Sequence, residues 1–325
     1  MAVFTTLTPL EVRKELPDFN IGELLSLEPI ASGIENTNYF LDTTEGRWVL
    51  TVFERLSESQ LPFYLELCAH LRSQGCPVAA PVRTKSGQLF SHIKGKPFSI
   101  ANRLEGRSIE NVPQKNAQAW VKCSPVCTLL PEVFSLFQEN LRGPQWWQAT
   151  APVVLPHLDP TVGAMLSEEV NHQLTVFSDS QFQALPVAAC HCDLFRNNAM
   201  IVGHGTEQEH VSGVFDFYFA GCTALLFDVA VTVNDWCTDF ESPDLHLDPR
   251  KTEAFLRAYH AVLPFTDAER RWWPDMLRAA ALRFWLSRLY DFYQPRKASL
   301  LKPHDPTYFE RILRNRKRVT FPLVD

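Results

Sequence analysis

Acidic and amide side chains gather in the run HCDLFRNN, in which Asp193 is followed five residues later by Asn198. A second carboxylate, Asp216, stands eighteen residues after Asn198, at the end of an apolar run. Phosphoryl transfer from a nucleotide needs such a set. One carboxylate orients the attacking hydroxyl and accepts its proton, while an amide oxygen and another carboxylate hold Mg²⁺ against the phosphates. Because a hard cation prefers oxygen ligands, the spacing predicts Mg²⁺-dependent phosphoryl transfer.

Apolar segments beside this run argue against the alternative that its His-x-Asp sequence occurs by chance and has no function. An isolated His-x-Asp, with Asp216 capping a turn, would be the simplest alternative. Residues 199–202 and 211–215 are apolar, however, and this pattern predicts two strands that flank the turn and leave Asp216 at the end of the second. The arrangement favours a functional site over chance.

The first hundred residues show the pattern of short strands separated by turns. Residues 39–41 and 47–53 are rich in β-branched and aromatic side chains, and the turn at 43–46 makes them an antiparallel hairpin. A serine cap, a proline in the first turn and a following glycine predict a helix over 57–74. Further short strands are expected at 81–82, 88–90 and 97–101.

After residue 103 the pattern becomes mainly helical. Two helices are expected at 252–262 and 275–293. We therefore predict an α+β protein with a small antiparallel β-rich lobe, residues 1–103, followed by a larger helical lobe, residues 104–325.

Composition and charge exclude several classes of protein. Hydrophobic residues at 46% and charged residues at 21% exclude collagen-like and wholly disordered chains. With a net charge of −6, the chain lacks the overall positive charge that nucleic-acid binding usually needs. The basic cluster at 311–318 is interpreted as the solvated face of a terminal helix. The longest uncharged apolar stretch, 219–227, is too short to span a membrane. Without an export signal, we expect a cytoplasmic protein with reduced cysteines and no nucleic-acid or membrane partner.

The run HCDLFRNN, followed by GVFDFYFAG, resembles the catalytic segment of the aminoglycoside phosphotransferase and choline kinase superfamily. Within it, the chain is similar to the homoserine kinases of this fold. The similarity extends from MAVFTTLT through ASGIENTNYFL, WVLTVFERL and ENLRGPQWW to RFWLSRLYDFYQPR and PHDPTYFERILRNR. It implies a protein-kinase-like bilobal fold, with nucleotide bound by the β-rich lobe and with catalysis and substrate binding in the helical lobe.

The resemblance also implies an activity. The expected reaction is ATP-dependent phosphorylation of the L-homoserine hydroxyl to O-phospho-L-homoserine, a step of threonine biosynthesis, with ATP and Mg²⁺ as cofactors. The resemblance leaves a monomer or a homodimer open. Two alternatives remain at this point: a choline or aminoglycoside type of hydroxyl kinase, and a nucleotide-binding pseudokinase without turnover.

Catalytic roles carry over to individual residues. Asp193 resembles the catalytic Asp, and Asn198 and Asp216 resemble the Mg²⁺ ligands. His191 matches a structural His that packs beneath the loop. Cys192 stands where the family pattern more often has Gly, so its Cβ requires a compatible backbone φ.

The nucleotide site is expected in the N-terminal lobe. The family's phosphate loop matches Ser32, Gly33, Asn36, Thr37 and Asn38. Leu104 and Glu105 fall where the lobes join, so their backbone is expected to meet adenine. The phosphate-pairing Lys of the wider superfamily is replaced by Thr51, with Arg47 and Arg55 as the nearest cations.

A homoserine site must offer a cation and an anion near the catalytic base. The last predicted helix supplies Arg283, Arg288 and Asp291, and Arg288 is placed to clamp a carboxylate bidentately. Ordinary ion pairs within the lobe account for these residues equally well. The tryptophans at 146–147 either line the pocket or fill the core. The acidic residues Asp235, Asp239 and Glu241 keep a cationic substrate open.

Residues 121–133, VKCSPVCTLLPEV, depart from the family pattern, which has a helix containing Leu-Ala-Arg-Leu-His-Leu there. Codons permitted for VKCSPVCT, namely GTG AAA TGC TCG CCC GTT TGC ACN, read one base earlier as Glu-Met-Leu-Ala-Arg-Leu-His. We hypothesise two compensating frameshifts or sequencing errors, with the normal frame resuming near Phe134.

Resequencing the gene tests this hypothesis. We expect codons that yield the family peptide in the shifted frame. Codons that do not yield it would show that the segment is native, and its two prolines would then each cost a core helix about 3 kcal/mol.

Overall fold

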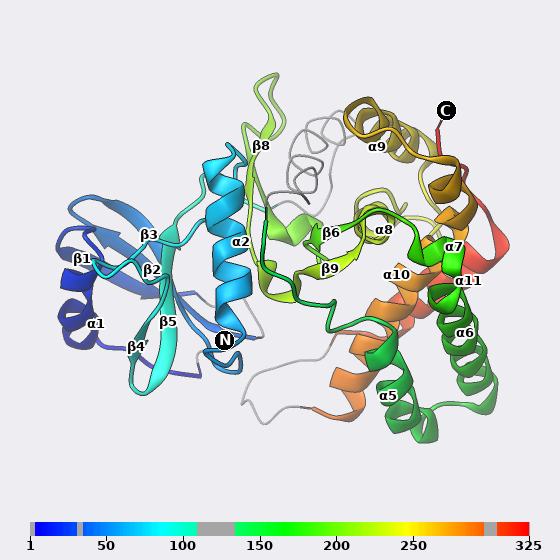
Figure 1. Ribbon diagram of the computed structural model, residues 1–325, viewed down its shortest axis with the longest axis horizontal. Helices are drawn as coiled ribbons and strands as arrows, with labels where there is room; N and C mark the ends of the chain where they lie inside the picture. Colours follow the sequence, from blue (N-terminus) through cyan, green and yellow to red (C-terminus); the bar gives the residue numbers. More distant parts are fainter. Residues whose placement is uncertain (1–3, 31–34, 109–133, 296–303, 325) are drawn as a thin grey trace. The chain divides into compact units, whose positions relative to one another are not determined.

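The computed structural model describes residues 4–30, 35–108, 134–295 and 304–324, and within them the chain divides into two compact units (Figure 1). One unit holds the described residues up to Glu105 together with Gly213–Phe215, and the other holds the rest. The first unit is built on an antiparallel sheet and the second mainly on helices. The α+β class expected from the sequence is confirmed.

A five-stranded antiparallel sheet forms the centre of the first unit. Its strands are β1 (Leu24–Pro29), β2 (Thr37–Thr43), β3 (Gly46–Val52), β4 (Ser91–Ile93) and β5 (Lys96–Asn102), in the order β1-β2-β3-β5-β4. The predicted hairpin is confirmed, since Thr43 pairs with Gly46 at the turn and Thr37 with Val52 at the far end.

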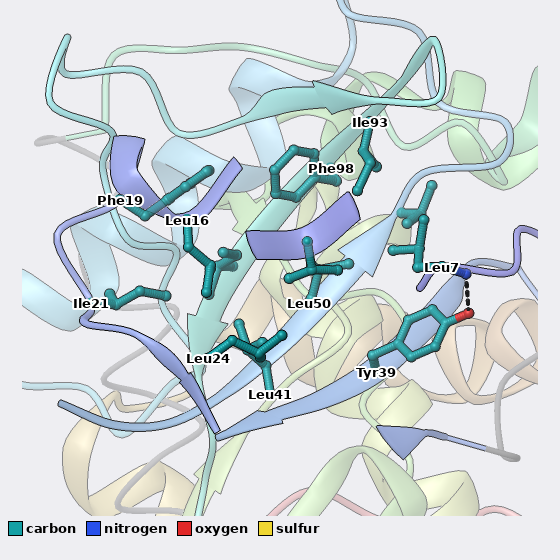
Figure 2. Close-up of a cluster of buried hydrophobic side chains, with 13 residues drawn as sticks. Leu7, Leu16, Phe19, Ile21, Leu24, Tyr39, Leu41, Leu50, Ile93 and Phe98 are labelled. Atoms are coloured by element: carbon teal, nitrogen blue, oxygen red, sulfur yellow. Dashed lines mark hydrogen bonds between the residues drawn. The ribbon is translucent and has the colours of Figure 1, made fainter. Parts of the chain in front are cut away.

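One face of this sheet is buried against α1 (Pro9–Glu15) and the segment that follows it. Leu41 of β2 and Leu50 of β3 have no exposed surface, and Figure 2 shows them in a cluster with Leu16 and Phe19 from the N-terminal segment. Successive strand residues point to opposite faces, so alternate positions enter this core. Each fully buried leucine contributes about 1.5–3 kcal/mol relative to an exposed one.

The second helix of this unit begins later than predicted. The helix expected over 57–74 is α2 (Leu61–Ser73). The Leu61 N–H donates to the Ser57 carbonyl at 3.2 Å, which makes the preceding residues a turn that leads into the helix.

The strand predicted at 88–90 was wrong, because β4 starts three residues further on. The Thr84 N–H donates to the Gln88 carbonyl at 2.7 Å and closes a turn at the predicted position. Leu89 is nevertheless buried, which explains the apolar signal.

The second unit contains seven helices among its described residues. These are α5 (Pro144–Val154), α6 (Pro160–Ser178), α7 (Ser180–Gln183), α8 (Leu225–Trp236), α9 (Pro249–Val262), α10 (Asp267–Tyr293) and α11 (Thr307–Arg318). Two small two-stranded sheets follow. β6 (Val187–Cys190) pairs with β9 (Gly221–Ala224), and β7 (Ala199–Val202) pairs with β8 (His210–Val214), whose last two residues are assigned to the first unit. The last pair confirms the strands predicted beside the acidic motif.

Both late helices begin earlier than predicted, because capping residues lie upstream of the predicted boundaries. The Asp248 carboxylate accepts backbone N–H groups at the start of α9. Thr266 and Glu269 form a reciprocal capping box that starts α10 eight residues before the predicted boundary. Pro274 lies inside α10 without ending it.

No helix in the described ranges is long and apolar enough to cross a membrane. The cluster at 311–318 was predicted to be a solvated helix face, and this holds only in part. Arg314 lies 2.8 Å from Glu310 and Lys317 3.0 Å from Glu168, whereas Arg316 is buried and donates to the Asn234 Oδ1 at 2.9 Å. Residues 121–133 lie outside the described residues.

The Tyr39 hydroxyl accepts the Leu7 N–H at 2.9 Å (Figure 2) and donates to the Thr5 carbonyl at 3.0 Å. We predict that Tyr39→Phe lowers the free energy of unfolding by about 1–3 kcal/mol, because a buried N–H loses its acceptor. Urea denaturation measures this change. Tyr290→Phe, at a site 39% exposed, is the control and should change stability by less than about 0.5 kcal/mol. Equal effects of the two substitutions would contradict the prediction.

Candidate active site

Asp193 lies in the loop that leaves β6, and Asn198 folds back onto it. The Asn198 Nδ2 donates to the Asp193 backbone carbonyl at 2.8 Å and to its carboxylate Oδ2 at 3.3 Å. The predicted spacing therefore brings the two side chains together through a local turn. Because Nδ2 faces Asp193, the other end of the amide, Oδ1, is the end that offers an oxygen to a cation.

The Asp193 carboxyl sits in surroundings that favour its protonated form. Burial raises its pKa to about 7, the Arg283 guanidinium opposes this shift, and the nearby Asp216 carboxylate adds to it. The side chain keeps 17% of its surface exposed. A buried but reachable carboxylate whose pKa lies near neutrality suits proton transfer from a hydroxyl.

Asp216 follows β8 in a left-handed backbone conformation, with φ of 65°. Asp tolerates this region better than most residues, and the turn leads into a short 3₁₀ helix, Phe217–Phe219. Among the described residues, no group of three or more His, Cys, Asp or Glu side chains is placed to hold a metal ion. Mg²⁺ needs no such group when nucleotide phosphates and waters complete its shell. The Asn198 amide oxygen and the Asp216 carboxylate are donors of the right type.

Helix α8 holds the start of the catalytic loop through a buried carboxylate. Asp228, in its first turn, accepts the backbone N–H of Cys192 at 2.7 Å and that of His191 at 3.2 Å. Burial raises the pKa of Asp228 to about 6, and the two hydrogen bonds oppose the rise. Sequence reasoning missed this role, although a carboxylate at the start of an otherwise apolar helix was an available signal.

The far end of α8 holds the rest of the loop. The Trp236 Nε1 donates to the Leu194 carbonyl at 3.0 Å. The Asp235 carboxylate accepts the Arg196 backbone N–H at 2.8 Å and its Nε at 3.0 Å. Asp235 is therefore engaged by Arg196, which argues against the cationic-substrate role that the sequence left open for it.

Cys192 adopts the left-handed conformation that its unusual position required, with φ of 59°. Its thiol is buried, and burial raises its pKa well above the ordinary value. The His191 ring packs against the Phe217 ring, with centroids 4.4 Å apart. Both side chains are buried, at 4% exposure for His191 and 1% for Cys192.

The three α10 residues expected at the substrate end have different surroundings. Arg283 is buried, with Nη2 3.8 Å from the Asp193 Oδ1. The Arg288 guanidinium lies over the Tyr308 and Phe309 rings, 5.1 and 4.5 Å from their centroids. In the described part of the chain, Arg288 has no carboxylate within ion-pair distance. Asp291 lies near enough to influence the pKa of Arg283.

The tryptophan pair divides between core and surface. Trp147 has no exposed surface and packs against Phe177, with centroids 5.2 Å apart. Trp146 is less buried, and the Arg142 guanidinium lies 4.7 Å from its ring centroid. Trp147 thus belongs to the core.

The predicted phosphate loop is described only in part, because Ser32 and Gly33 lie outside the described residues. The Asn36 Oδ1 accepts the Glu54 N–H at 3.4 Å. The Asn38 Oδ1 accepts the Thr51 hydroxyl at 2.8 Å, so the strand position that lacks Lys is paired with the residue opposite it on β2.

The Thr37 hydroxyl is hydrogen-bonded to residues of its own unit. Its buried hydroxyl accepts the Phe4 and Thr5 N–H groups at 2.9 and 3.1 Å and donates to the Glu54 Oε1 at 2.6 Å. Because these hydrogen bonds engage the Thr37 hydroxyl, only the backbone of Thr37 remains for the contact with nucleotide that the sequence predicted. Leu104 and Glu105 are the last residues of the first unit's main segment.

Comparisons with known proteins relate the chain to a family of kinases. Residues 26–282 match the Phosphotransferase enzyme family. A homoserine kinase from Cupriavidus necator is 49% identical over 97% of this chain and 96% of its own length. A homoserine kinase from Paraburkholderia phymatum is 47% identical over 97% of this chain and 98% of its own length.

Solved structures share the fold at low identity. Amicoumacin kinase in complex with AMP-PNP, Ca²⁺ and Ami matches with a TM-score of 0.65 and 15% identity, over 94% of this chain and 91% of that one. An ethanolamine kinase from Plasmodium vivax matches with a TM-score of 0.59 and 14% identity, over 90% and 82%. These likenesses confirm the predicted kinase-like fold.

We predict that Asp228→Asn lowers the free energy of unfolding by about 1–3 kcal/mol. Each carboxylate oxygen accepts one backbone N–H, and in the amide an NH₂ group would replace one of these oxygens and face a donor. Urea denaturation measures the loss, and hydrogen exchange at the His191 and Cys192 amides should become faster. The control is Glu253→Gln, which alters an exposed pair with Arg257 and should cost less than about 0.5 kcal/mol. Unchanged exchange at both amides would contradict the anchoring role.

Proposed function

The chain belongs to the phosphotransferase enzyme family and, within it, to the group of homoserine kinases, and we propose that it transfers the γ-phosphoryl group of ATP to the hydroxyl of L-homoserine. The product is O-phospho-L-homoserine, as in threonine biosynthesis. The observation that carries this proposal is identity of 47–49% over nearly the whole length of both chains.

Asp193 is the proposed catalytic base. Its carboxylate orients the acceptor hydroxyl and takes its proton as the oxygen attacks the γ-phosphorus, and a pKa near 7 supports this role. Asn198, through Oδ1, and Asp216 are the proposed ligands of Mg²⁺. The cation, when bound, neutralises charge on the nucleotide phosphates.

The acceptor is a small amino acid that carries a carboxylate, an ammonium group and the reacting hydroxyl. Arg288 is the proposed partner of the carboxylate, supported by its lack of a carboxylate partner within the described ranges. Asp291, one helical turn further along α10, is the proposed partner of the ammonium. A choline or aminoglycoside acceptor would need convergent carboxylates or an aromatic cage, and the pairing of Asp235 with Arg196 weakens that alternative.

The nucleotide is proposed to contact the first unit. Asn36 and Asn38, with the backbone of Ser32, Gly33 and Thr37, would meet the phosphates, and the backbone of Leu104 and Glu105 would meet adenine. The Thr51 hydroxyl stands where the wider superfamily has a Lys, and this departure is the observation that favours the pseudokinase alternative.

The proposed compartment is the cytoplasm, where ATP is available. The cysteines support it, because the six in the described residues are free thiols and a reducing compartment preserves them. A monomer or homodimer stays a prediction.

The test is Mg²⁺-dependent ADP release from the purified chain with L-homoserine, choline or an aminoglycoside. We expect release with L-homoserine, and we expect Asp193→Asn to lower kcat by about 10²–10⁴-fold because the proton acceptor is lost. Asp267→Asn, an exposed change at the start of α10, is the matched control and should retain activity.

Release with choline or the aminoglycoside instead would reassign the substrate. A folded protein that binds ATP without any release would establish the pseudokinase, and full activity of Asp193→Asn would overturn the catalytic assignment.

A further inference from the structure

Arg283 is a guanidinium enclosed by the protein. Its side chain is 4% exposed. It lies between two aromatic rings of the same unit, 3.8 Å from the Phe284 centroid and 5.0 Å from the Phe219 centroid. Ring faces attract a desolvated cation, so these two contacts stabilise the buried guanidinium.

The carboxylate paired with this guanidinium is that of Asp193. The Arg283 Nη2 lies 3.8 Å from the Asp193 Oδ1, within ion-pair distance but beyond a hydrogen bond. The Nε and Nη2 atoms are buried, and neither has a hydrogen-bond partner among the described residues. Arg142 adds a like charge nearby, and burial lowers the pKa of Arg283 to about 10 while Asp193 opposes that shift. A buried cation is costly unless paired, so Arg283 and Asp193 stabilise each other's charge.

Arg288, five residues further along α10, differs in each respect. It is partly exposed, and its contacts are the faces of the Tyr308 and Phe309 rings. It has no carboxylate partner in the described part of the chain. Arg283 is therefore a buried cation paired with Asp193, whereas Arg288 is a partly exposed cation.

We propose that Arg283 is a positioning residue, which orients the Asp193 carboxylate through their ion pair, whereas Arg288 alone binds the carboxylate of the amino-acid acceptor. This inference deepens the proposed function and rests on it. The Nε and Nη2 atoms of Arg283 are buried, and a substrate carboxylate beside the guanidinium would lie against the negative charge of Asp193. The assignment replaces the substrate-binding role that the sequence predicted for Arg283.

The experiment compares Arg283→Met and Arg283→Lys with the matched pair Arg288→Met and Arg288→Lys in the full chain. Initial rates give kcat and KM for L-homoserine. We expect Arg283→Met to lower kcat by about 10²-fold, because a misplaced catalytic group costs that much, with KM changed less than about twofold. Arg283→Lys should recover part of kcat because it keeps the charge. Arg288→Met should raise KM by about 10–100-fold, the effect of losing hydrogen bonds to a charged group.

Calorimetric titration of each variant with L-homoserine separates binding from turnover. We expect Arg283→Met to bind L-homoserine as the wild type does and Arg288→Met to bind it weakly. A raised KM or weakened binding in either Arg283 variant, with kcat unchanged, would overturn the proposal, as would wild-type kinetics of Arg283→Met.

Thermal denaturation and ATP binding establish that each variant is folded. If Arg283→Met does not fold, Arg283→Lys decides, since it must lower kcat and leave binding intact. A wild-type chain that neither binds nor phosphorylates L-homoserine refutes the proposed function, whereas a wild-type chain that does both, beside an Arg283 variant with a raised KM, refutes only this inference.

Discussion

The carboxylate of Asp228 is the constraint on which the catalytic loop depends. It accepts two consecutive backbone N–H groups, from His191 and Cys192, in a buried setting where an uncompensated charge would be strongly unfavourable. The same two donors belong to the turn in which Cys192 adopts a left-handed conformation. Because a non-glycine residue is strained there, hydrogen bonds that over-determine the turn are what keep it in place.

Once the loop is fixed, the other elements complete the site around its tip. Asn198 closes the loop locally on Asp193. Helix α10 packs against α8 and brings Arg283 to the same carboxylate. The proposed proton acceptor, Asp193, is therefore held by the loop backbone, by a neighbouring amide and by a charge from a distant helix. Such preorganisation is what phosphoryl transfer asks of a protein, because catalysis there consists largely of positioning and electrostatics.

The sequence predicted those features that short spacings encode. The turn joining Asp193 to Asn198 is local, and so is the hairpin of β2 and β3. The contact of Asp228 with the loop spans 36 residues, so no periodicity could reveal it. The predicted start of the last long helix, residue 275, lies eight residues inside α10, because the capping box of Thr266 and Glu269 begins the helix earlier. Thr37 matched a phosphate loop by type, but its partners in the N-terminal segment became visible only in three dimensions.

The central claim is that the loop directs an acceptor hydroxyl at the γ-phosphorus of ATP. Phosphorus NMR of the reaction mixture with L-homoserine, ATP and Mg²⁺ tests it most directly. The account predicts a phosphomonoester signal split by the two protons of the methylene group that carries the acceptor oxygen. Formation of inorganic phosphate alone, or of a phosphoryl signal without that coupling, would contradict transfer to the hydroxyl.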